Sequence, residues 1–101
     1  MTLHTWNKAR TSHPSFELCR TSMAPGDALL LLEDGVYSAL ELAFVQLLQG
    51  SEQDSAYPCY ALAADLAARG ISAKIPNSVN VVDYMDFVAL CLQHDRVVNW
   101  A

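Results

Sequence analysis

Short apolar runs alternate along this chain with segments in which apolar residues recur every three or four positions. The runs are continuous rather than polar at every second position, which is typical of strands buried on both faces of a parallel sheet. We therefore predict five strands, at residues 2–6, 28–32, 59–63, 79–82 and 97–100. The helical spacing between them predicts helices at residues 15–23, 36–47 and 65–70, and from a cap at residue 83 to about residue 94.

Turn and capping residues mark the ends of these elements. Pro14 stands where a first helical turn accepts proline, and Pro58 precedes rather than interrupts the third strand. Gly35 permits a tight exit from the second strand, and Gly50 is a plausible helix C-cap. Asp83 is placed to cap the last helix.

Strands that alternate with amphipathic helices define an α/β fold. We predict a three-layer α/β/α sandwich with a mostly parallel five-stranded sheet, because both faces of such a sheet need helical cover. The 101 residues are enough for one core, so we expect a single domain over residues 1–101.

The composition indicates a subunit of a larger assembly. Hydrophobic residues make up 52% of the chain and charged residues only 17%, against about a quarter in an average soluble domain. So few charges leave apolar surface uncovered, which favours burial against other subunits. The net charge of −5 and six scattered Lys and Arg residues argue against direct nucleic-acid binding.

The chain carries no sequence signal for a membrane or for export. No run approaches the roughly 20 apolar residues of a membrane-spanning helix, and the start lacks the pattern of a signal peptide. We therefore expect a cytoplasmic location and no membrane partner. In that reducing compartment Cys19, Cys59 and Cys91 are expected to be thiols.

Cys19 is the candidate for chemistry among the three cysteines. It lies within the first predicted helix and is followed by Arg20, and a nearby cation or helix start lowers a thiol pKa. The alternative is a structural thiol, because Phe16, Cys19 and Met23 share one helical face and free cysteine is among the most buried residue types. Cys59 and Cys91 fall on apolar faces and are interpreted as core residues.

Three acidic residues support a more remote hypothesis. Glu33, Asp34 and Asp83 follow predicted strands, and ligands bind at that edge of open α/β sheets. Such a cluster suits Mg²⁺ and a phosphoacceptor or nucleotide-binding role, but the lysine expected after the last strand of such a site is missing. In the alternative interpretation, Asp34 shapes a turn and Asp83 caps a helix.

The remaining motifs predict neither a metal nor a cofactor. His4, His13 and His94 are far apart and share no metal-ligand spacing with one another or with the cysteines. The four glycines are isolated, so there is no phosphate-binding loop and no nucleophile elbow.

Several segments in a fixed order resemble the TusB/DsrH family of small sulfur-relay subunits. The first begins Leu3-His4-Thr5, the second ends a buried strand in Glu33-Asp34-Gly35, and the last closes on Trp100. The matching segments are residues 3–5, 30–37, 60–62, 65–70 and 82–88, continuing to residue 94 and residue 100. The resemblance covers nearly the whole chain.

The resemblance implies a function that the residues alone do not. It implies a heterohexamer with two copies each of this subunit and of two paralogous sister subunits. The complex passes persulfide sulfur from a donor protein to a small acceptor protein, for wobble 2-thiouridine in tRNA or for sulfur oxidation. Cys19 matches a cysteine found in the sulfur-oxidation type and is the candidate persulfide carrier. The alternative is a non-catalytic structural or docking subunit of the same complex.

Overall fold

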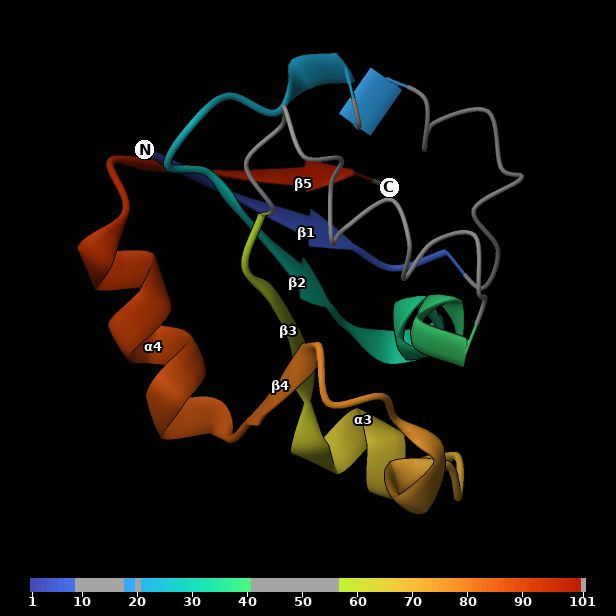
Figure 1. The fold of residues 1–101 in the computed structure, drawn as a ribbon. Helices are drawn as coiled ribbons and strands as arrows, with labels where there is room; N and C mark the ends of the chain where they lie inside the picture. Colours follow the sequence, from blue (N-terminus) through green and yellow to red (C-terminus); the bar gives the residue numbers. More distant parts are fainter. Residues whose placement is uncertain (9–17, 20, 41–56, 101) are drawn as a thin grey trace.

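A five-stranded parallel sheet organises the molecule, in the order β4-β3-β2-β1-β5 (Figure 1). The computed structural model describes residues 1–8, 18–19, 21–40 and 57–100. Each neighbouring pair of strands in this sheet runs parallel, which confirms the predicted α/β fold. The strands are β1 (Thr2–Trp6), β2 (Ala28–Leu31), β3 (Cys59–Leu62), β4 (Val79–Val82) and β5 (Arg96–Trp100).

After β2, two α-helices and two 3₁₀ helices connect the described strands. The 3₁₀ helix η1 (Glu33–Leu40) follows β2, and α3 (Ala63–Ala68) follows β3 without a break. The short 3₁₀ helix η2 (Ser72–Lys74) precedes β4, and α4 (Tyr84–Gln93) joins β4 to β5. Residues 15–17, 20 and 41–47 of the predicted helices, and the Gly50 cap, lie outside the described residues. Leu18, Cys19, Thr21 and Ser22 are helical as predicted.

Side chains on the two faces of the sheet form separate apolar clusters. On one face Leu29 and Leu31 of β2 pack with η1 and α3. On the other face Ala28 and Leu30 pack with Leu90 of α4. Figure 1 shows α4 on the opposite side of the sheet from η1 and α3. The continuous apolar sequence of β2 is thus explained by burial on both faces.

The direction of the crossovers explains why α4 lies on the opposite face of the sheet from η1 and α3. From β1 to β4 the strands are added in one direction, and the chain then returns to the far side of β1. Crossovers between parallel strands are right-handed, so reversing the direction of addition moves the connecting helix to the opposite face.

Local sequence signals place the start of α4. The Asp83 carboxylate accepts a hydrogen bond of 2.8 Å from the Asp86 backbone N–H, and the Asp86 carboxylate accepts one from the Asp83 N–H. This reciprocal capping box satisfies two N–H groups at the helix start. It confirms Asp83 as the cap.

Gly35 lies against the carboxyl end of β1. A Cβ atom at Gly35 would stand 2.0 Å from the carbonyl oxygen of Trp6, so no larger residue fits without movement of the backbone. Glu33, two residues earlier, has a φ of 51°, in the left-handed region. The turn after β2 is therefore tight, as Gly35 predicts. The residue in this turn with a left-handed backbone conformation is Glu33.

Among the described residues, no helix has the length and apolar character needed to cross a membrane.

Candidate thiol site at the sheet switch point

The carboxyl ends of β1 and β5 mark the point where the sheet changes its direction of growth. Trp6 and Trp100 end these strands and are register partners. In open α/β sheets, ligands bind outside the carboxyl ends of strands at such a switch point. This is the place where the fold favours a functional site.

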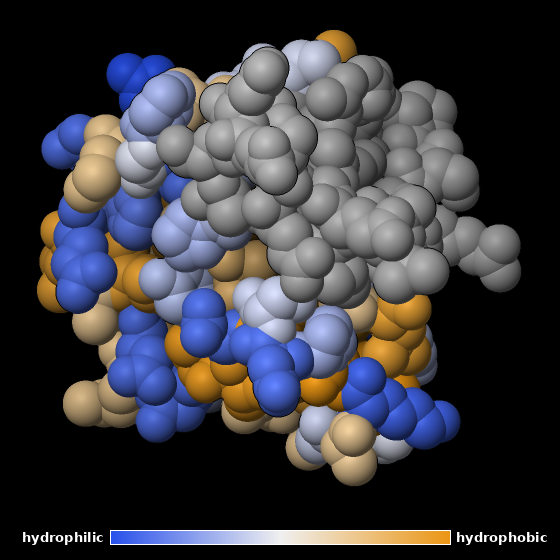
Figure 2. All heavy atoms as spheres, in the orientation of Figure 1, coloured by the Kyte–Doolittle hydropathy of each residue, from blue (hydrophilic) through white to orange (hydrophobic). Residues whose placement is uncertain are grey.

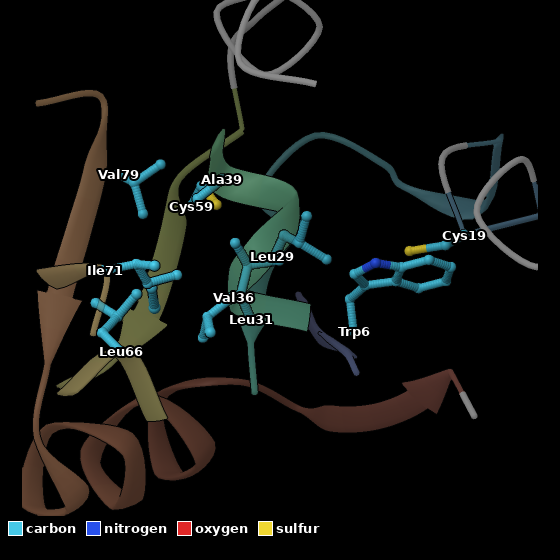
Figure 3. Close-up of a cluster of buried hydrophobic side chains, with 11 residues drawn as sticks. Trp6, Cys19, Leu29, Leu31, Val36, Ala39, Cys59, Leu66, Ile71 and Val79 are labelled. Atoms are coloured by element: carbon cyan, nitrogen blue, oxygen red, sulfur yellow. The ribbon is translucent and has the colours of Figure 1, made fainter. Parts of the chain in front are cut away.

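Cys19 lies on the η1 side of this switch point. It belongs to the same apolar cluster as Trp6, and in Figure 3 the two side chains lie at one end of that cluster. Only 1% of Cys19 is exposed, so the thiol has almost no contact with solvent. Arg20, which follows Cys19 in the sequence, lies outside the described residues.

Burial disfavours the thiolate form of Cys19. Desolvation raises the pKa of its thiol to about 12, because the thiolate loses the hydration that stabilises its charge. Sulfur transfer requires a thiolate that a donor can reach. In this conformation the Cys19 thiol is covered, and its role as a persulfide carrier stays a prediction.

The other two cysteines differ from each other in exposure. Cys59 is buried in β3, and desolvation raises the pKa of its thiol as well. Cys91 on α4 is partly exposed and packs against the edge of the second cluster. The burial of Cys59 confirms its interpretation as a core residue, while Cys91 is only partly in the core. Of the three thiols Cys91 is the most accessible. The carrier hypothesis instead requires that Cys19 be accessible to a donor.

A buried polar network ties the two ends of the chain together. His4 Nε2 lies 3.0 Å from an Asp27 carboxylate oxygen, and both side chains are buried. The indole N–H of Trp100 donates to His4 Nδ1 over 3.0 Å, and the two rings stack with centroids 6.2 Å apart. The network therefore links β1, the turn before β2 and the end of β5.

The partners of His4 determine its tautomer. An indole N–H only donates, so His4 Nδ1 accepts from Trp100 and carries no proton. His4 Nε2 consequently bears the hydrogen and donates it to the Asp27 carboxylate. This neutral tautomer satisfies both ring nitrogens.

Asp27 is held as a carboxylate by convergent donors. Burial is the largest single effect and would raise its pKa, but the hydrogen bond from His4, two backbone hydrogen bonds and the charge of a protonated His4 together outweigh it. The backbone N–H groups of Ala24 and Thr2 also donate to it, over 3.0 Å and 2.8 Å. The net result is an Asp27 pKa below its ordinary value. Sequence reasoning missed this residue, and its position directly before the second apolar run was the only available signal.

Two of the three acidic residues of the phosphoacceptor hypothesis have other partners. Asp34 pairs with Arg69 of the α3 C-cap, with the guanidinium Nε 3.0 Å from a carboxylate oxygen. Asp83 is occupied in the capping box of α4. In the part of the chain that the structure describes, no three His, Cys, Asp or Glu side chains gather as a metal site. The turn and cap roles therefore account for Asp34 and Asp83.

The fold and the site together define a class of protein: a small open α/β domain with a covered thiol beside the switch point of its sheet. The family model described as "DsrH like protein" matches residues 9–97. The curated Protein TusB of Pectobacterium carotovorum subsp. carotovorum is 38% identical over 90 residues, which cover 87% of this chain and 90% of the relative.

Two further relatives agree with this match. Protein TusB of Escherichia coli (strain K12 / DH10B) is 37% identical over 79 residues, covering 77% of this chain and 79% of the relative. Protein TusB of Salmonella dublin is 43% identical over 76 residues, covering 74% and 76%. The chain belongs to the TusB/DsrH family, as the sequence resemblance predicted.

Proposed function

We propose that this chain is a non-catalytic subunit of a sulfur-relay complex, in which it completes the assembly while a sister subunit carries the persulfide. The observation that supports this role is the state of Cys19, which is 1% exposed with its thiol pKa raised to about 12. The exposed apolar residues of α4 support an assembly role independently. The proposed partners are two paralogous sister subunits in a heterohexamer, a sulfur-donor protein and a small acceptor protein.

The tRNA branch of the family is the proposed setting. The relatives compared above bear the name TusB, and this supports a relay that ends in wobble 2-thiouridine of tRNA. The acidic net charge of −5 fits a subunit that serves RNA chemistry through protein partners rather than by contact with the RNA. We assign the complex to the cytoplasm.

Cys19 as the persulfide carrier is the second candidate. Its place beside Trp6, at the switch point of the sheet, supports it. In that mechanism a partner subunit uncovers the thiol, and the Cys19 thiolate attacks the outer sulfur of a donor persulfide. A sulfur–sulfur bond forms on Cys19, the bond in the donor breaks, and the donor leaves as a thiolate. No external oxidant or reductant is needed.

Sulfur loading of the assembled complex separates the two candidates. The chain is mixed with its sister subunits and a persulfide donor, and each subunit is mapped by non-reducing mass spectrometry. We expect the added sulfur on a sister subunit, and undiminished transfer to the acceptor by a complex containing Cys19→Ala. A dithiothreitol-reversible sulfur on Cys19, together with loss of transfer in Cys19→Ala, would establish the carrier role instead.

Two controls keep this test interpretable. Cys91→Ala removes the partly exposed thiol and should leave both loading and transfer unchanged. Co-purification of Cys19→Ala with the sister subunits shows that the variant is folded, because a loss of packing at this buried site would otherwise resemble a loss of chemistry. Failure of the unmodified chain to co-purify with the sister subunits would refute the assembly role.

A further inference from the structure

His4 is a buried imidazole on the face of the sheet opposite α4. Its neighbour Leu3 packs in the second cluster, with α4, and successive side chains of a strand point to opposite faces. Both ring nitrogens of His4 have partners, Asp27 at Nε2 and Trp100 at Nδ1. Imidazole is the side chain that changes its charge closest to neutral pH, so protonation of His4 would act on both partners.

The hydrogen bond between Trp100 and His4 exists only while His4 Nδ1 carries no proton. An indole N–H donates and cannot accept, and an imidazolium bears a hydrogen on both nitrogens. Protonation therefore sets two N–H groups against each other across the 3.0 Å that separate Trp100 Nε1 from His4 Nδ1. On the other side of the ring, the Asp27 carboxylate accepts from Nε2 in either state, and its charge stabilises the imidazolium. Protonation thus keeps the bond to Asp27 and breaks the bond to Trp100.

The other titratable groups around His4 are exposed, paired or uncharged. The Arg96 guanidinium lies on the same face of β5 as Trp100 and is exposed to solvent. The Met1 ammonium and the Asp95 carboxylate pair with each other at 2.6 Å. Burial disfavours the thiolate of Cys19, which lies on the same side of the sheet. In the part of the chain that the structure describes, the Asp27 carboxylate is therefore the one buried charge in contact with the ring.

Trp100 can leave its place without disturbing the sheet. It is the last residue of β5, so its departure frays a single register pair, and strand ends open at little cost. Asn99 before it is held, because the Thr5 hydroxyl donates to its side-chain oxygen over 2.8 Å. The partly buried indole packs against the cluster that contains Trp6 and Cys19. Its release would uncover that cluster at the switch point of the sheet.

We propose that protonation of His4 releases the indole of Trp100, so that a fall in pH opens the switch point of the sheet. The neutral ring holds Trp100 in place, and the imidazolium does not. Because open α/β sheets bind ligands at such a point, this device controls access to that region. It lies on the opposite face from the apolar residues that reach the surface in Figure 2 on the side where Figure 1 places α4. It depends neither on those residues nor on whether Cys19 carries sulfur.

Fluorine NMR of the full-length chain labelled with 5-fluorotryptophan tests the proposal. The chain has two tryptophans, and Trp100→Phe assigns their signals. From about pH 8 to about pH 5 we expect the Trp100 signal to move toward that of free 5-fluorotryptophan. The movement should follow the His4 ring signal, observed with carbon-labelled histidine, in one protonation step. The Trp6 signal should stay in place, because that side chain is fully buried and its indole N–H donates to the Ser38 hydroxyl.

Histidine substitutions separate this device from other effects of acid. His4→Gln places an uncharged side chain beside Asp27 at every pH and should abolish the movement of the Trp100 signal. His94→Gln is the matched control, because His94 follows α4 with its Nδ1 2.7 Å from the Leu90 carbonyl oxygen, and it should leave the movement unchanged.

Trp100→Phe gives a second test that does not require His4→Gln to fold. Without the opposing indole N–H, the His4 ring signal should titrate at a pH higher by about 0.5–1 unit, which corresponds to the loss of one hydrogen bond. The reciprocal effect is required by linkage between the proton and the docked indole. An unchanged midpoint would show that Trp100 and the proton do not compete for His4.

Four other results would overturn the proposal. They are a Trp100 signal that stays in place while His4 titrates, a His4 ring that stays neutral down to about pH 5, a movement of Trp100 that persists in His4→Gln, and a movement that disappears in His94→Gln. Movement of both tryptophan signals with loss of the circular dichroism of the fold would be acid unfolding and would overturn it as well. None of these results bears on the proposed role in the relay complex.

Discussion

Replacing Gly35 by alanine should destabilise the fold far more than a surface glycine substitution does. The added Cβ would lie 2.0 Å from the Trp6 carbonyl oxygen and 2.7 Å from its carbonyl carbon. Cβ atoms essentially never approach another atom more closely than 3.0 Å, so η1 and the end of β1 must separate by about 1 Å. Both sides of this contact are backbone, and no flexible side chain can move to relieve it.

The magnitude follows from what that separation disturbs. Overpacking that side chains absorb costs about 1–3 kcal/mol, and a backbone clash lies at the upper end of that range or above it. The same Trp6 carbonyl accepts a hydrogen bond of 3.0 Å from Leu32 N–H, and weakening this bond adds about 1 kcal/mol. We expect Gly35→Ala to lower the free energy of unfolding by about 3–4 kcal/mol, a large part of the about 5–15 kcal/mol typical of a domain.

Gly70→Ala is the matched control for this experiment. Gly70 has a φ of 68°, so alanine there adopts a left-handed conformation, but no atom beyond the adjacent residues lies within 4 Å of the new Cβ. Its cost is therefore backbone strain alone, about 1–2 kcal/mol. Urea denaturation followed by circular dichroism measures both variants at one protein concentration, because self-association shifts apparent stability. A loss for Gly35→Ala no larger than that for Gly70→Ala would refute the argument from close approach.

Three further substitutions test the other structural assignments. Because the pKa of Asp27 is lower in the folded chain than its unfolded value of about 3.9, Asp27 contributes stability above that pH and loses it as the pH falls through the folded pKa. Urea midpoints at pH 7 and pH 3 should therefore converge in Asp27→Asn, and an unchanged pH dependence would contradict the network. Asp83→Ala should cost about 1 kcal/mol through loss of the capping box, measured as the midpoint shift against wild type, and no shift would show that the cap is dispensable. Arg69→Met should cost less than about 1 kcal/mol in the same assay, because its partner Asp34 is exposed, and a larger loss would reveal a stronger interaction than the ion pair.

Much of the sheet is predictable from local sequence. Two strands, Thr2–Trp6 and Val79–Val82, begin and end where the apolar runs do, and the other three differ by one residue at one end. Apolar runs locate strands well because a strand buried on both faces needs an unbroken apolar segment. The capping residue Asp83 is also predictable from local sequence, because an N-cap side chain bonds to the N–H groups of the next few residues.

The candidate site depended on contacts between distant parts of the chain. Asp27 acquires its role from His4, 23 residues away, and His4 receives its second hydrogen bond from Trp100, 96 residues away. A polar residue before an apolar run gives no sign of such partners. The pairing of Asp34 with Arg69 likewise joins two segments that the sequence separates by 35 residues.

The alternation of strands and helices, the capping of α4, the tight turn at Gly35 and the family are predictable from the amino-acid sequence, because each depends on a short-range pattern or on the order of segments. The environment of Cys19 depends instead on how distant segments pack. Residues 18–22 show one thiol on a helix beside a cation and an apolar face, which allows either an active or a structural cysteine. Packing beside Trp6 removes that thiol from water and raises its pKa, and desolvation is a property of the assembled core that no local pattern encodes.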